Sequence, residues 1–198
     1  MGEKNLYQPL TKEDKVTVVL YRVGIAVSSL IVSALAYMAF FARNEAFASL
    51  IADVLIVLLY LSVGVSVFFI HLYISKFHRA LKKLYYLSLA ALAALLLIGK
   101  GDIVWVVANK PYGPLLLMPL SGCLGFITAK EAFCFRLLEG YLIAMVMPLY
   151  LLVLAIGGMS QRGASYGLFL IAAMLVLFTF RKVFMPLHFD IGDKSAYT

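Results

Sequence analysis

One long apolar stretch, residues 128–158, limits what this chain can fold into more than any other feature. It reads TAKEAFCFRLLEGYLIAMVMPLYLLVLAIGG, with charges confined to its first third. Thr128 and Glu131 match a capping box, in which a hydroxyl and a carboxylate accept hydrogen bonds from backbone N–H groups at a helix start. The pattern therefore predicts one continuous helix from about Ala129 to Gly157.

The length of this helix implies a membrane. At about 1.5 Å per residue it would measure roughly 43 Å, which exceeds the ~30 Å hydrocarbon layer of a bilayer. A span counted back from Gly157 begins near Leu137, so Arg136 is expected at one boundary and Glu139 barely inside it. Hydrophobic residues make up 64% of the chain and charged residues 14%, against roughly 45–50% and about 25% in a globular domain. We therefore predict an all-α polytopic membrane helix bundle.

The other apolar segments predict about six transmembrane helices in a single domain, residues 1–198. A polar N-terminal tail, 1–15, contains a second capping box at Thr11 and Asp14. A helix bundle over 16–182 follows, and then a C-terminal tail, 183–198. The expected spans are about 16–41, 49–75, 84–98, 114–127, 137–157 and 163–180.

Two segments leave the number of spans open. Residues 103–107 are too short to cross, and the neighbouring aromatic rings Trp105 and Tyr112 favour the headgroup level. Residues 114–127 cover only about 21 Å as a helix, and Pro119 lies in their middle. They form either a short or bent span or a re-entrant segment, and we favour the span.

The distribution of basic residues predicts the orientation. Six spans place both termini on one side, and 13 of the 17 Lys and Arg residues then fall on that side. The positive-inside rule makes it the cytoplasmic side. The densest basic segment, residues 76–83, is expected to be a loop there. Small residues four apart, such as Gly24 and Ser28, predict close helix packing.

Ionisable residues are expected at the ends of the spans rather than at their centres. Arg22 lies near enough to its boundary to extend to the headgroups. Asp53 is ~13 Å from the middle of its span. Ion-coupled carriers usually keep an ionisable group near the bilayer centre. This distribution argues against a proton relay, while a passive channel or uncoupled carrier remains an alternative.

Few residues suit cofactor or redox chemistry. His71 alone is a candidate ligand for one haem or chlorophyll, although a histidine hydrogen-bonded at the interface is the favoured interpretation. Cys123 and Cys134 are interpreted as small buried hydrophobes, and spacing does not show whether they are redox active. The sequence has no nucleophile elbow and no HExxH motif. We therefore expect no enzyme activity, no cofactor, no metal and no nucleic-acid partner.

A set of charged residues at the cytoplasmic edge is the candidate site for a partner or for lipid headgroups. Arg136 and Glu139 are three residues apart and can pair along one helix face. In the alternative interpretation Glu131 caps the helix, the basic residues anchor it, and Arg136 only neutralises Glu139. Arg136→Ala is then expected to reduce the amount of folded protein more than Glu139→Gln does. The candidate residues are Lys76, Arg79, Lys82, Lys83, Lys130, Arg136 and Glu139.

The run KEAFCFRLLEGY at residues 130–141, with GCLGF upstream, resembles an uncharacterised integral-membrane family of cyanobacteria and plastids. This family is a domain of unknown function in the twenty-three-oh-one series, and the similarity covers most of the chain. The resemblance implies a thylakoid or plasma membrane location by association only, and it carries over no catalytic residue. We expect a non-enzymatic accessory or assembly protein that packs against a membrane complex, such as a photosynthetic one. The alternative is a small-solute channel or uncoupled carrier.

Overall fold

The computed structural model describes residues 10–41, 46–72 and 74–191, and their regular structure is entirely helical. Three basic residues that enter the orientation count, Lys4, Arg43 and Lys194, lie outside this described part. The helices are α1 (Lys12–Phe41), α2 (Ala46–Phe69), α3 (Ser75–Gly99), α4 (Ile103–Asn109), α5 (Tyr112–Leu116), α6 (Met118–Phe135), α7 (Leu138–Ala155), α8 (Gln161–Val183) and α9 (His188–Ile191).

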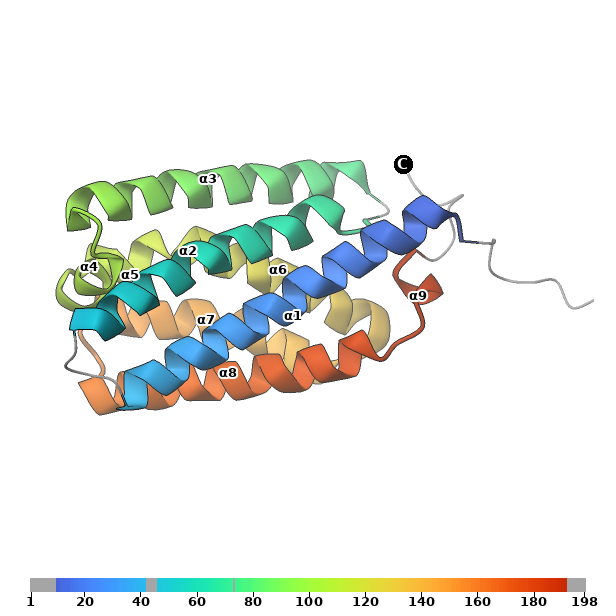
Figure 1. Ribbon diagram of the computed structural model, residues 1–198. Coiled ribbons are helices and arrows are strands. Elements are labelled where there is room, and N and C mark those ends of the chain that lie inside the picture. Colours follow the sequence, from blue (N-terminus) through green and yellow to red (C-terminus); the bar gives the residue numbers. More distant parts are fainter. Residues whose placement is uncertain (1–9, 42–45, 73, 192–198) are drawn as a thin grey trace, which may run out of the picture.

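The six longest of these helices pack into one bundle, and each runs in the opposite direction to the preceding one (Figure 1). They are α1, α2, α3, α6, α7 and α8. The short helices α4 and α5 lie at one end of the bundle, which we call the far end. The opposite end, where α1 begins and α8 finishes, is called the termini end, and α9 contacts α1 there.

Five of the helices are long and apolar enough to cross a membrane, namely α1, α2, α3, α7 and α8. Helix α6 lies among them but carries Lys130 and Glu131 in its second half. The prediction of an all-helical polytopic membrane protein is therefore confirmed.

Local sequence explains how α1 begins. The Thr11 N–H donates to Asp14 Oδ2 at 2.8 Å, and the Asp14 N–H donates to Thr11 Oγ1 at 3.2 Å. These two hydrogen bonds satisfy donors that a helix start leaves without partners. The capping box predicted at this position is confirmed.

The connection from α3 to α4 also follows from local residues. Gly101, with φ of 100°, takes a conformation that glycine adopts without strain. Its N–H donates to the Leu96 carbonyl at 3.0 Å and closes the end of α3. Asp102 then caps α4 by accepting a hydrogen bond from the Trp105 N–H at 2.7 Å. The segment predicted to be too short to cross is this seven-residue helix.

The continuous helix predicted from Ala129 to Gly157 is wrong. Helix α6 ends at Phe135, Arg136 adopts a left-handed conformation with φ of 55°, and α7 starts at Leu138. The front third of residues 128–158 therefore extends the segment 114–127, which was predicted to be a short or bent span. Residues 118–135 form the resulting 18-residue helix, which is about 27 Å long, while residues 114–116 belong to α5. Thr128 lies inside this helix, where its hydroxyl donates to the Gly125 carbonyl at 3.1 Å.

Two further expectations need correction. The basic segment 76–83, expected to be a loop, forms the first two turns of α3, because α2 already ends at Phe69. The expected C-terminal tail is folded up to residue 191, and Asp190 and Ile191 in α9 are buried.

Close packing between α1 and α2 agrees with the small residues in their sequences. A Cβ atom added at Gly24 would lie 2.3 Å from Ser66 Oγ and 2.7 Å from the Ser62 carbonyl oxygen. Ser28 Oγ and Ser62 Oγ lie 2.8 Å apart and share a hydrogen bond. The two backbones can approach this closely only because position 24 has no side chain.

Candidate functional site

Five charged residues come together inside the termini end of the bundle, and we call them the buried ion-pair cluster. They come from four helices that are distant in sequence, so only the folded chain assembles them. Arg22 is on α1, Lys130 and Glu131 are on α6, Lys182 is on α8 and Asp190 is on α9.

Asp190 joins two of the basic residues. Arg22 Nε donates to Asp190 Oδ2 at 2.7 Å, and Lys182 Nζ pairs with Asp190 Oδ1. The Arg22 guanidinium also donates to the carbonyls of Val183 at 3.1 Å and Pro186 at 3.0 Å, and to that of Met185. The segment after α8 is therefore fixed to α1 by charge-assisted hydrogen bonds, which are stronger than neutral ones.

Glu131 is the second carboxylate of the cluster and is fully buried. Its Oε1 accepts from Tyr21 Oη at 2.7 Å and from Lys130 Nζ at 2.7 Å, and its Oε2 pairs with Lys182 Nζ. Lys182 is fully buried too, and its ammonium lies 4.1 Å from the centre of the Phe135 ring. Glu131 therefore holds α1, α6 and α8 together and does not cap a helix start.

Every charged group in the cluster has a partner of opposite charge. The cluster contains three cations and two carboxylates, and each carboxylate contacts two of the cations. Buried charges are tolerated when they are paired, and removing one partner leaves the other uncompensated at high cost. We infer that these groups stabilise the termini end of the bundle.

The sequence did not predict that Arg22 and Lys182 belong to a buried ion-pair cluster. Arg22 was expected to extend to the headgroups, but its side chain is only 7% exposed and pairs with Asp190 instead. Lys182 was placed at the end of the predicted helix bundle, 16–182, and Asp190 in the predicted C-terminal tail. The signal that was available is the spacing of Lys182 and Asp190, eight residues apart just after an apolar span.

The expected pair between Arg136 and Glu139 does not form. Arg181 Nη1 lies 2.8 Å from both carboxylate oxygens of Glu139, and Glu139 itself is buried. Arg136 is exposed at the turn between α6 and α7. Because this turn interrupts the predicted helix, the spacing of three residues no longer places the two side chains on one helix face.

The other basic candidates lie at the same end of the bundle. Lys76, Arg79 and Lys83 are exposed at the start of α3, and no ion pair to them occurs among the described residues. They recur at helical spacing and so share one face. Lys82 points elsewhere, with its ammonium 5.5 Å from the centre of the Phe68 ring. We call Lys76, Arg79 and Lys83 the basic face.

His71, the candidate cofactor ligand, lies in the connection between α2 and α3. Its Nε2 is 3.3 Å from Thr17 Oγ1, while its Nδ1 is buried without a hydrogen-bond partner in the described part of the chain. Burial, with the charge of Lys130 as the next cause, lowers the pKa of His71 below its ordinary 6.5. The ring is thus neutral at pH 7. No group of three or more His, Cys, Asp or Glu residues suited to a metal ion occurs within the described ranges.

Both cysteines lie on α6, and the interpretation as buried hydrophobes is right for Cys123 and wrong for Cys134. Cys123 is buried in α6, and Cys134 is exposed near its end. Eleven residues of helix separate them by about 16 Å, so they cannot form a disulfide within one chain.

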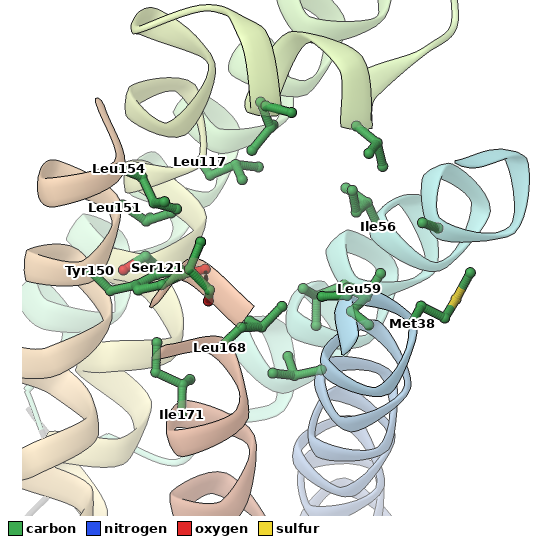
Figure 2. A pocket seen from close by; sticks show the side chains of 18 of the residues that line it. Met38, Ile56, Leu59, Leu117, Ser121, Tyr150, Leu151, Leu154, Leu168 and Ile171 are labelled. Carbon is green, nitrogen blue, oxygen red and sulfur yellow. Dashed lines mark hydrogen bonds between the residues drawn. The ribbon is translucent and has the colours of Figure 1, made fainter. Parts of the chain in front are cut away.

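The second notable feature is an apolar pocket in the far half of the bundle, with a volume of about 440 Å³. Side chains from α1, α2, α4, α6, α7 and α8 line it, and Figure 2 shows several of them around the open space. Water would find few partners on its walls. The pocket therefore suits an apolar occupant.

Packed side chains close this pocket toward the termini end. The residues one to two helical turns beyond its lining are at most 1% exposed. They are Ile25, Ile127, Ile143 and Leu175. At the far end, Asp53 accepts a hydrogen bond from the Val104 N–H at 2.9 Å and so fixes α4 to α2.

Comparison with protein families identifies a family for this chain. The model of a family described as "Uncharacterized integral membrane protein (DUF2301)" matches residues 65–198, about two thirds of the chain. No curated protein and no solved structure matches. The matched residues include α3 to α9, and with them all of the buried ion-pair cluster except Arg22. The chain belongs to the DUF2301 family of uncharacterised integral membrane proteins.

Proposed function

We propose that this protein is a non-enzymatic accessory or assembly protein that packs against another membrane complex. The observation that carries this proposal is the buried ion-pair cluster, in which each of the five charged groups contacts at least one group of opposite charge. Groups held in such pairs stabilise one conformation, whereas catalysis and coupled transport need acids or bases free to exchange protons or ions. A rigid bundle of this kind suits a binding or structural role.

The proposal includes six crossings with both termini in the cytoplasm. Helix α6 supports the sixth crossing, because it is 18 residues long and runs antiparallel to its packing neighbours α3 and α7. An even number of crossings returns the chain to its starting side. The basic face and most other Lys and Arg residues gather at the termini end, and basic residues favour the cytoplasmic side.

A channel or uncoupled carrier for a small polar solute is less well supported. Such a function needs a polar route through the whole bundle. The pocket is apolar and stops at the buried layer formed by Ile25, Ile127, Ile143 and Leu175. The ion-pair cluster lies nearer the termini end, where Lys182 and Glu131 are fully buried. Opening a route there would separate paired charges.

The basic face supplies the chemistry for the contact with a partner. Lys76, Arg79 and Lys83 are exposed together, and they follow one another on one side of α3 at the proposed cytoplasmic boundary. An acidic surface on the cytoplasmic side of a neighbouring membrane complex would complement them. A thylakoid or plasma membrane location, and a photosynthetic partner, rest on the family resemblance alone.

Affinity purification from native membranes in a mild detergent tests the proposal. We expect a stoichiometric partner complex with the native chain. Changing Lys76, Arg79 and Lys83 together to Gln should release it. The matched control changes Lys100, Lys110 and Arg162 to Gln, which removes three basic side chains from the far end of the bundle. Recovery of the native chain without a partner, together with solute flux in liposomes, would replace the proposal with the channel.

A further inference from the structure

The apolar pocket contains one buried hydroxyl that the protein itself does not use. Ser121 is only 8% exposed, and its Oγ has no hydrogen-bond partner in the described part of the chain. Figure 2 shows this side chain among those that line the pocket. A buried hydroxyl without a partner is costly, so most are paired in native structures.

Three other polar side chains in the lining have partners within the protein. Tyr150 Oη donates to the Ala164 carbonyl at 2.9 Å, Ser165 Oγ donates to the Ala39 carbonyl at 2.9 Å, and Ser49 Oγ donates to Asp102 Oδ1 at 3.4 Å. Serines elsewhere in the long helices donate to a carbonyl one turn earlier, as Ser28 and Ser33 do. Ser121 thus leaves a free O–H donor inside an otherwise apolar space.

We propose that the pocket binds an elongated apolar molecule whose carbonyl oxygen accepts a hydrogen bond from Ser121. The volume of about 440 Å³ falls within the roughly 300–1,000 Å³ typical of small-molecule sites. Along α8 the lining extends from Gln161 to Ile171, which is about 15 Å of helix. The pocket is therefore about as deep as the hydrocarbon layer of one leaflet, and it can hold a chain that lies parallel to the helices.

The position of Ser121 places the carbonyl inside the pocket and not at its rim. Ser121 lies four residues, or about 6 Å, beyond Leu117 at the start of the lining on α6. The walls around it are aliphatic, including Ile56, Leu151 and Leu168. In such surroundings a single hydrogen bond favours a molecule with an acceptor over an equally long hydrocarbon, because only the former satisfies the hydroxyl.

Two sources have this chemistry: the ester end of a bilayer lipid, and a free membrane-soluble carbonyl compound such as a quinone with an apolar tail. The proposal goes beyond the accessory role and holds whether or not a partner complex exists. The two sources can be distinguished by purifying the native chain in polymer-bounded native membrane discs. The compounds that co-purify are then extracted and identified by mass spectrometry. A bilayer lipid enriched over the surrounding membrane indicates the first source, and an enriched carbonyl compound indicates the second.

Direct binding can be measured with two matched probes, methyl palmitate and hexadecane, which share a sixteen-carbon chain but differ in the ester carbonyl. The protein is kept in dodecyl maltoside, which has no carbonyl group. A ligand that binds only the folded state raises the unfolding temperature. We expect methyl palmitate to raise it by more than hexadecane does in the native chain. In Ser121→Ala this difference should disappear while a common response to the two chains remains.

Filling the pocket provides the second test. Ile171→Trp should abolish the response to both probes, and Leu168→Trp serves the same purpose if the first variant does not fold. Ser88→Ala is the control, because Ser88 is buried on α3 outside the pocket and donates to the Tyr85 carbonyl. Equal shifts with the two probes in the native chain would overturn the proposal. So would the absence of any response, or an undiminished response after the pocket is filled.

Discussion

Arg22 and Asp190 lie 168 residues apart in sequence, and Arg22 Nε donates to Asp190 Oδ2 at 2.7 Å. Both side chains are almost fully buried. Through this pair the segment that follows the last long helix is fixed against the first one. The contact explains why the residues that follow α8, up to residue 191, are packed against the bundle instead of forming the predicted polar tail.

Asp190→Asn should destabilise the protein strongly. The amide keeps the shape of the carboxylate but leaves Arg22 and Lys182 without their shared countercharge. Breaking a buried pair in this way typically costs about 3–5 kcal/mol, so we expect a large fall in unfolding temperature in detergent. Glu13→Gln is the control because Glu13 is exposed. Similar unfolding temperatures for the two variants would show that the Asp190 pairs contribute little.

Tyr21→Phe tests the neutral member of the same network. The change removes the hydroxyl that donates to Glu131 Oε1 at 2.7 Å and retains the ring. Hydrogen bonds to charged groups are worth about 1.5–3 kcal/mol, so the loss should be smaller than that in Asp190→Asn. Thermal unfolding compares it with Tyr37→Phe, a tyrosine that is 63% exposed. A loss no greater than in that control would contradict the prediction.

The sequence predicted the membrane spans well because the signal for a span is local. Apolar length and flanking charges identify α1, α2, α3, α7 and α8 without knowledge of tertiary contacts. The capping box at Thr11 and the close approach at Gly24 were predicted for the same reason, since the sequence signal for each, Thr11 with Asp14 and Gly24 with Ser28, consists of residues a few positions apart.

The turn at Arg136 and the ion-pair cluster were missed for physical reasons that differ. Arg136 takes a left-handed conformation that glycine or asparagine usually occupies, so no punctuating residue marks the end of α6. The capping pattern at Thr128 and Glu131 then occurred by coincidence inside a helix. The cluster depends on contacts such as Lys182 with Glu131, and no local pattern reports a contact between distant helices.

The structure reverses the expected order of damage at Arg136 and Glu139. Arg136→Ala should be nearly neutral because the side chain is exposed, and Arg136→Gly should stabilise by up to about 1 kcal/mol by relieving the left-handed conformation. Glu139→Gln should cost about 1 kcal/mol, since it removes the charge that pairs with the half-exposed Arg181 at 2.8 Å. Unfolding temperatures of the three variants give the order. A larger loss in Arg136→Ala than in Glu139→Gln would contradict it.

His71 should make stability depend on pH below neutrality. Burial and Lys130 lower its pKa from 6.5, His78 adds to this effect, and Asp190 and Asp14 oppose it. A base whose pKa is lower in the folded state binds a proton more readily when unfolded. Stability should therefore decrease as the pH falls from about 7 through 6.5, and level off below the folded-state pKa.

The matched variant for this pH dependence is His71→Gln, which cannot titrate. We expect its unfolding temperature to change less between pH 7.5 and pH 5 than that of the native chain. The measurement is the difference between the two profiles, so acidic groups common to both cancel. Parallel profiles over the whole range would rule out a contribution from His71.

Gly24→Ala should separate α1 from α2. The added methyl group would lie 2.3 Å from Ser66 Oγ and 2.7 Å from the Ser62 carbonyl oxygen, and that carbonyl belongs to a helix backbone that cannot move alone. Overpacking of this kind typically costs about 1–3 kcal/mol. Gly163→Ala is the opposite case, because its nearest neighbour would be Ser160 Oγ at an ordinary 3.4 Å. There the helix should gain about 0.4–1 kcal/mol. Thermal unfolding should thus shift in opposite directions for the two variants, and a shift in the same direction would mean that the α1–α2 contact is looser than its geometry indicates.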